Sequence, residues 1–134
     1  MHAVTFGIPN QEEFFMADSN ELKTRTKQFV LRVLKLVDTL PSNSAGRTIG
    51  NQLLRSGTSV GANYRSACRG RSVAEFCAKL GIVEEEADEA AYWMELLVEA
   101  GMVKEQLLTP LMKEANEIVA MVVASIKTAR KSKS

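Results

Sequence analysis

The acidic side chains between residues 73 and 100 are the first feature of this sequence that suggests chemistry. The segment holds eight acidic residues and one lysine, and carboxylates facing the interior of a helical bundle can bind two metal ions. Such centres also need Glu-x-x-His pairs, and His2, far from this segment, is the one histidine of the sequence. Four of the acids share a helical stripe that differs from the apolar one: Glu84, Asp88, Glu95 and Glu99. We therefore expect a solvated or salt-bridged face, with no metal ion, no cofactor and no catalytic residue.

The two cysteines, Cys68 and Cys77, are the candidate nucleophiles. Neither has a histidine partner to activate it, and both sit beside apolar positions where thiols are buried and inert. Their spacing fits no metal-ligand pattern, so we expect reduced thiols in a cytoplasmic protein. No apolar run approaches the roughly 20 residues that span a bilayer, and the first residues show no signal-peptide pattern, so no membrane partner is expected.

The stretch "RSGTSVGANYRSACRGRS", residues 55–72, mixes glycine and hydroxyl residues with arginine and could form a phosphate-cradling loop. Phosphate loops of the G-x-x-x-x-G-K-[ST] type need a lysine that follows neither Gly57 nor Gly61. The two glycines lie four residues apart, and other small side chains extend the same helical face: Ser56, Ser59, Asn63 and Ala67. Small residues permit close approach of a second helix, although each glycine costs up to about 1 kcal/mol of helix propensity. We therefore interpret the stretch as a tightly packed helix.

Basic residues gather at the ends of two predicted helices. Residues 47–72 carry five arginines and no acid, which contrasts with the acidic segment that follows. The candidate nucleic-acid-binding residues are Arg65, Arg69 and Arg71 in the first cluster, and Lys127, Arg130 and Lys131 in the second. Because helices two and four of an up-and-down bundle run parallel, both clusters should lie at one end and attract phosphates. The alternative is that these cations complement helix C-termini and pair with acids of the third helix.

Capping residues, prolines and glycines, together with the spacing of apolar residues, divide the chain into four predicted helices. The first starts after Asp18 and ends at Pro41, and the second starts within Ser42–Ser44 and stops at Gly70. The third follows a capping box of Ser72 and Glu75 and spans 73–100. The fourth opens at Thr109-Pro110, where a capping residue precedes a proline at the first helical position.

The connections between these helices are short, which favours antiparallel neighbours. We expect an all-α fold, an up-down-up-down antiparallel four-helix bundle over residues 19–130. Residues 1–18 form an N-terminal extension, either a flexible or an interface arm, and 131–134 form a basic tail.

The third and fourth predicted helices carry more apolar surface than one bundle core can bury. A bundle helix normally buries one stripe, and each of these two helices has a second. The residues of the second stripes are Trp93 and Leu96 on the third helix, and Met112, Val119, Val123 and Ile126 on the fourth. Because a monomer would expose them, we predict that they form the interface of a homo-oligomer.

A group of short blocks between residues 51 and 97 carries a family resemblance. They include Arg55-Ser56, Ala62-Asn63, Gly70-Arg71-Ser72, Glu86-Ala87-Asp88-Glu89 and Tyr92-Trp93-Met94-Glu95-Leu96-Leu97. In this order the blocks resemble the four-helix bundle family known as 23S rRNA intervening-sequence proteins, and looser similarity covers residues 20–128. The resemblance implies a bacterial bundle of unknown function that assembles as a ring-like homopentamer, without established catalytic activity.

The residues and the resemblance together favour a non-enzymatic oligomeric scaffold or interaction protein. Its expected partners are further copies of itself, and RNA or a nucleic-acid-handling protein. The alternative function is a metal- or cofactor-dependent enzyme built in the bundle core.

Overall fold

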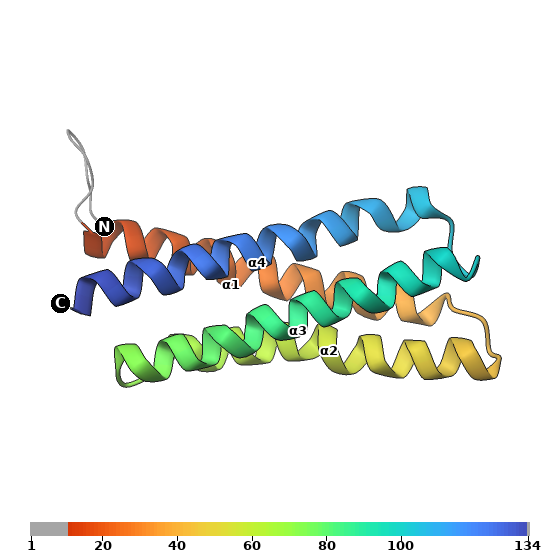
Figure 1. The fold of residues 1–134 in the computed structure, drawn as a ribbon, viewed down its shortest axis with the longest axis horizontal. Helices are drawn as coiled ribbons and strands as arrows, with labels where there is room; N and C mark the ends of the chain where they lie inside the picture. Colours follow the sequence, from red (N-terminus) through yellow and green to blue (C-terminus); the bar gives the residue numbers. More distant parts are fainter. Residues whose placement is uncertain (1–10, 134) are drawn as a thin grey trace.

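Four long helices build the structure. The computed structural model describes the backbone of residues 11–133 and the side chains of residues 19–132. The helices are α1 (Gln11–Asp38), α2 (Ser44–Cys68), α3 (Val73–Glu99) and α4 (Glu105–Lys133), and no strand occurs in the described residues. Figure 1 shows them lying along one long axis, with the start of α1 and the end of α4 at the same end of the molecule. The predicted all-α class is confirmed.

The caps of α2 and α3 lie where the sequence predicts them. The Asn43 side chain accepts a hydrogen bond from the Gly46 amide at 2.8 Å and caps α2. The Ser72 hydroxyl accepts from the Glu75 amide at 3.1 Å, and the Glu75 carboxylate accepts in return from the Arg71 amide. Each cap satisfies amide groups that have no partner within the helix, so both helix starts are fixed locally.

Two predicted helix starts are wrong. Helix α1 begins at Gln11, so Asp18 lies inside it, and residues 11–18 of the predicted extension are helical. This segment, "QEEFFMAD", contains mainly residues of good or neutral helix propensity, and no glycine or proline interrupts it. Residues 1–10 of the predicted arm lie outside the described residues. At the other end, α4 continues to Lys133, so the predicted tail is largely helical.

Helix α4 begins at Glu105, one turn before the predicted Thr109-Pro110 start. Proline at 110 lacks the amide that would bond to the Gln106 carbonyl, which makes this turn weaker than an ordinary one. The earlier start places Leu108 in the core, where it is 1% exposed. Burial of a leucine stabilises the fold by about 1.5–3 kcal/mol, which offsets the lost hydrogen bond.

The core runs the length of the bundle and receives side chains from all four helices. Consecutive helices pack side by side, and α1 also packs against α4, so α1 and α3 occupy diagonal corners, as do α2 and α4. The largest fully buried side chains include Phe29, Leu53, Tyr64, Met94 and Ile118. Apart from Thr26, Ser56 and Ser125, the buried positions among the described residues are not polar.

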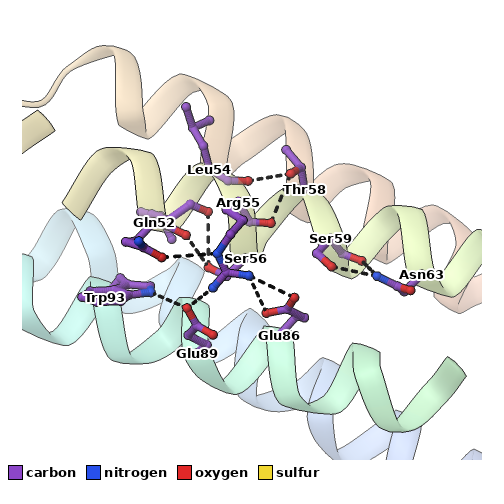
Figure 2. A network of polar contacts seen from close by, with 11 residues as sticks. Gln52, Leu54, Arg55, Ser56, Thr58, Ser59, Asn63, Glu86, Glu89 and Trp93 are labelled. Carbon is purple, nitrogen blue, oxygen red and sulfur yellow. Dashed lines mark hydrogen bonds and ion pairs between the residues drawn. The ribbon is translucent and has the colours of Figure 1, made fainter. Parts of the chain in front are cut away.

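The small residues of α2 allow α1 to approach closely, as the sequence predicts. A Cβ atom added at Gly57 would lie 2.8 Å from Val33, and one added at Gly61 would lie 2.9 Å from Val30. Both distances are shorter than side chains tolerate, so glycine is required at these positions by packing rather than by backbone conformation. Asn63 is half-buried and donates to the carbonyl and hydroxyl of Ser59 within the same helix (Figure 2).

Candidate functional site

An ion-pair network joins the first half of α2 to α3. Figure 2 shows Arg55 reaching between Glu86 and Glu89, with its Nη1 atom 3.2 Å from the Glu86 carboxylate and its Nη2 bonded to Glu89. The Trp93 indole donates to the same Glu89 carboxylate at 2.9 Å. These contacts use four side chains from two helices, so the network ties α2 to α3 near the middle of the bundle.

The pKa values of the network follow from these contacts. The hydrogen bond from Trp93, then the hydrogen bond and charge of Arg55, lower the pKa of Glu89 from its ordinary value of 4.5. The pKa of Arg55 is raised, mainly by the hydrogen bond to Glu89 and to a smaller extent by the charges of Glu86 and Glu89. Both groups therefore stay charged at neutral pH, and the network has a structural role.

A second network joins α1 to α4. The Arg25 guanidinium donates to both oxygens of Glu114, at 2.9 and 2.8 Å, and to Glu117 at 2.6 Å. Its pKa is raised, mainly by the hydrogen bonds to Glu114 and Glu117. Arg25 also contacts Glu21 of its own helix at 3.5 Å. A bidentate arginine of this kind is a geometrically specific clamp between helices.

The acidic stripe on α3 has no arrangement suited to metal binding. Asp88, Glu95 and Glu99 are exposed, and Glu84 is half-buried. Among the described residues no three histidine, cysteine, aspartate or glutamate side chains gather closely enough to hold a metal ion. Cys77 is a buried free thiol, and Cys68 is half-buried with its sulfur 3.5 Å from the Ser19 hydroxyl.

A groove flanks the second half of α2 on each side, one toward α1 and one toward α3. A groove of about 710 Å³ lies between α1 and α2, with Val30, Gly61 and Tyr64 among the residues of its lining. A smaller groove of about 370 Å³ lies between α2 and α3. Arg65 and Arg69 line both grooves, because they stand on the exposed ridge of α2 that separates them.

Six cations line these two grooves, and we call them the basic ridge: Lys23, Lys27, Arg65, Arg69, Arg71 and Lys79. No side-chain ion pair links any of them to a carboxylate whose side chain the structure describes. Glu75 lines the smaller groove, but its carboxylate accepts from the Arg71 amide. The basic ridge therefore keeps its positive charge available to an external anion.

The basic ridge contains three of the predicted site residues and three that sequence reasoning missed. Arg65, Arg69 and Arg71 were predicted, whereas the lysines come from α1 and α3. Lys23 and Lys27 stand in the first predicted helix and Lys79 stands in the acidic segment, so their positions along the sequence do not place them beside the arginines. The short connections between helices could have indicated Lys79, because a helical hairpin brings the start of α3 beside the end of α2.

The predicted cluster on α4 does not join the basic ridge. Figure 1 shows the ends of α2 and α4 at the same end of the molecule, as expected. However, α4 packs against α1 and α3 and lies diagonally across from α2. Lys127, Arg130 and Lys131 are exposed, and none of them lines either groove. The structure thus places the two predicted clusters at one end but at opposite corners.

The predicted interface residues are all half-buried: Trp93, Leu96, Met112, Val119, Val123 and Ile126. Four of these six pack in part against the core of their own chain, namely Trp93, Met112, Val119 and Ile126. Among the described residues, the large apolar side chains with most exposure lie elsewhere: Leu31 at 48%, Leu34 at 42%, Tyr92 at 51% and Leu107 at 70%. The contribution of the six predicted residues to self-association stays a prediction.

Within the described residues, no helix combines the length and the apolar character that crossing a membrane requires. Exposed charged side chains of both signs occur on α1 and α4, whereas those of α2 are arginines and those of α3 are carboxylates.

Comparison with known proteins gives a consistent result. The family model described as 23S rRNA-intervening sequence protein matches residues 18–124. A crystal structure of a protein of unknown function from the S23 ribosomal protein family of Bacteroides thetaiotaomicron is 33% identical, with a TM-score of 0.78. The match covers 82% of this chain and 98% of that one. No curated protein matches the chain. The family match spans most of the sequence and the same four helices, so this chain belongs to the family of 23S rRNA-intervening sequence proteins.

Proposed function

We propose that this protein is a non-enzymatic, oligomeric helical scaffold that binds RNA through the basic ridge. The observation that supports this function is the set of six cations around two grooves, with no ion pair to a described carboxylate. Arg55 on α2 pairs with the two carboxylates that α3 presents to it, whereas Arg65 and Arg69 face solvent. A row of cations without ion-pair partners is typical of a protein surface that binds a phosphate backbone.

We take RNA as the polyanion, because the description of the family contains 23S rRNA. The proposal includes the finer architecture, an up-down-up-down antiparallel bundle that assembles as a ring-like homo-oligomer in the cytoplasm. The family resemblance implies five copies. Repetition of the basic ridge around such an assembly would multiply the RNA contacts and raise the overall affinity through multivalency.

The test is a titration of fluorescent single-stranded RNA, read by anisotropy at several salt concentrations. Each phosphate contact lowers the slope of log affinity against log salt by about 0.7 for single strands. We expect Arg65→Ala/Arg69→Ala to weaken binding and to flatten the slope. The matched control is Arg47→Ala/Lys104→Ala, which removes the same charge from two exposed residues that make no ion pair with a described residue and do not line either groove. Equal loss of affinity in the two variants would reduce the interaction to net charge and would overturn the assigned surface.

A further inference from the structure

Two outward faces of the bundle carry opposite charge around exposed apolar side chains. The α1 face consists of Lys27, Leu31, Arg32, Leu34 and Lys35. The α3 face consists of Glu85, Asp88, Tyr92, Glu95, Leu96 and Glu99. All of these side chains are exposed except Leu96, which is half-buried. Of the four strongly exposed large hydrophobic side chains among the described residues, Leu31, Leu34 and Tyr92 belong to these faces.

The two faces cannot meet within one molecule. Helices α1 and α3 occupy diagonal corners and make no contact with each other, so their outward faces point away from one another. The described ion pairs leave the charged residues of both faces without a partner. Each face therefore has a complement, but only on another copy of the chain.

The spacing along the two helices also matches. On the α1 face, Lys27 and Lys35 stand four residues before and after Leu31. On the α3 face, Asp88 stands four residues before Tyr92 and Glu95 stands three residues after it. With a rise of about 1.5 Å per residue, charges of opposite sign lie about 4.5–6 Å on either side of an apolar centre. The Tyr92 ring is held against Trp93, with ring centroids 5.1 Å apart, so the apolar centre of the α3 face is well defined.

We propose that the α1 face of one copy docks on the α3 face of the next copy. An apolar centre with a charged rim is the usual anatomy of a protein interface, and opposite charges select the partner and its orientation. Because the two faces differ, the contact is head-to-tail, and repeated contacts build a ring if the rotation closes. Two α1 faces repel each other, as do two α3 faces, so the charges disfavour a symmetric dimer through either face. This inference rests on the self-association contained in the proposed function.

The experiment reverses the charge of each face separately and then of both. The α1 variant is Arg32→Glu/Lys35→Glu, which leaves Lys27 and the rest of the basic ridge intact, and the α3 variant is Asp88→Lys/Glu95→Lys. We expect the wild type to exceed the mass of one 14.7 kDa chain by light scattering at micromolar concentration. Each variant should associate at least about tenfold more weakly, because like charges then face each other. Circular dichroism checks that each variant remains helical.

Restoration of the contact is the decisive readout. The chain that carries all four substitutions has complementary faces again, so its mass should return toward the wild-type value. An equimolar mixture of the two double variants should also associate, since each supplies the face that the other lacks. Wild-type mass in both double variants, or no recovery in the fourfold variant, would overturn the docking of these faces while leaving oligomerisation intact. A wild type with the mass of one chain would overturn both this inference and the oligomeric part of the proposed function, and RNA binding to the basic ridge would still be measured separately.

Discussion

The two halves of α2 carry the same residue type in different electrostatic surroundings. In the first half, Arg55 bonds to Glu86 and Glu89 of α3. Arg65 in the second half, and Arg69 directly after its last residue, stand on an exposed ridge between two grooves and make no ion pair with a described residue. An arginine of the first kind holds two helices together, and an arginine of the second kind is available to a ligand.

The position of the acids along α3 explains the difference. Since a short connection joins the two helices into a hairpin, the end of α2 lies beside the start of α3. Seven of the eight acids of α3 lie at or beyond residue 84, opposite the first half of α2, whereas its first turns carry only Glu75 and Lys79. Because the acids are concentrated in one part of the sequence, the arginine beside them forms ion pairs, and the arginines at the end of α2 do not.

The largest expected effect comes from Gly57→Leu, which separates α1 from α2 and disturbs both halves. A Cβ atom at this position would lie 2.8, 3.1 and 3.3 Å from three atoms of the buried Val33 side chain. Overpacking of this kind costs about 1–3 kcal/mol, which exceeds the gain of up to about 1 kcal/mol in helix propensity. Urea unfolding should show the loss, and a wild-type midpoint would mean that the helices adjust without cost.

A carboxylate placed opposite the second half of α2 should form ion pairs with the arginines there. Lys79→Glu places an acid in the groove that Arg65 and Arg69 line. We expect RNA affinity to fall about tenfold, through the lost cation and through competition for the arginines. Lys104→Glu, which makes the same change at the opposite end of the bundle, is the control. Similar affinity in the two variants would remove the distinction between the two halves.

The ion-pair network around Arg55 and Glu89 should make the stability of the protein depend on pH. Because the folded-state pKa of Glu89 is lowered from 4.5, its contribution to stability is complete above that value and is lost as pH falls through the lowered pKa. Glu89→Gln should therefore be less stable than the wild type at pH 7, and the difference should shrink under acid. Denaturant midpoints at pH 7 and pH 3 measure this, and a difference that does not change with pH would show that the carboxylate charge contributes nothing.

The smallest expected effect distinguishes glycines that pack from one that does not. A Cβ atom at Gly81, on α3, would meet no atom within 4 Å, in contrast to Gly57 and Gly61. Gly81→Ala should therefore raise the free energy of unfolding by about 0.5–1 kcal/mol through helix propensity alone. Thermal unfolding at a concentration where the protein is dissociated measures the gain. A loss of stability there would point to an intrachain role for this glycine.

Local signals predicted the boundaries of α2 and α3 and failed at the starts of α1 and α4. Asn43 and Ser72 cap their helices through short-range hydrogen bonds, so the sequence around them is sufficient. Asp18 and Thr109 have the same residue character, but each lies inside a longer helix. An N-capping residue begins a helix only where the segment before it has no reason to be helical. For α4, the burial of Leu108 gives the segment before Thr109 such a reason.

The candidate site was only half visible in the sequence. Arg65, Arg69 and Arg71 are close together along the chain, so their clustering could be read directly. The lysines that complete the basic ridge are remote from them and become neighbours only when helices pack. The cluster on α4 lies at the predicted end of the bundle (Figure 1), but its position diagonally across from α2 separates it from the arginines.

By itself, the sequence determined the helical class, the caps of α2 and α3, the requirement for small residues at Gly57 and Gly61, and the family. These features depend on interactions within a few residues of the chain, or on the size of a side chain, which the residue type alone specifies. Only the tertiary structure decided which arginines are neutralised and which remain free, because an ion pair depends on the residue that the neighbouring helix presents a few ångströms away. The longitudinal register of α2 against α3 sets that residue, and the register is a property of the whole packed bundle.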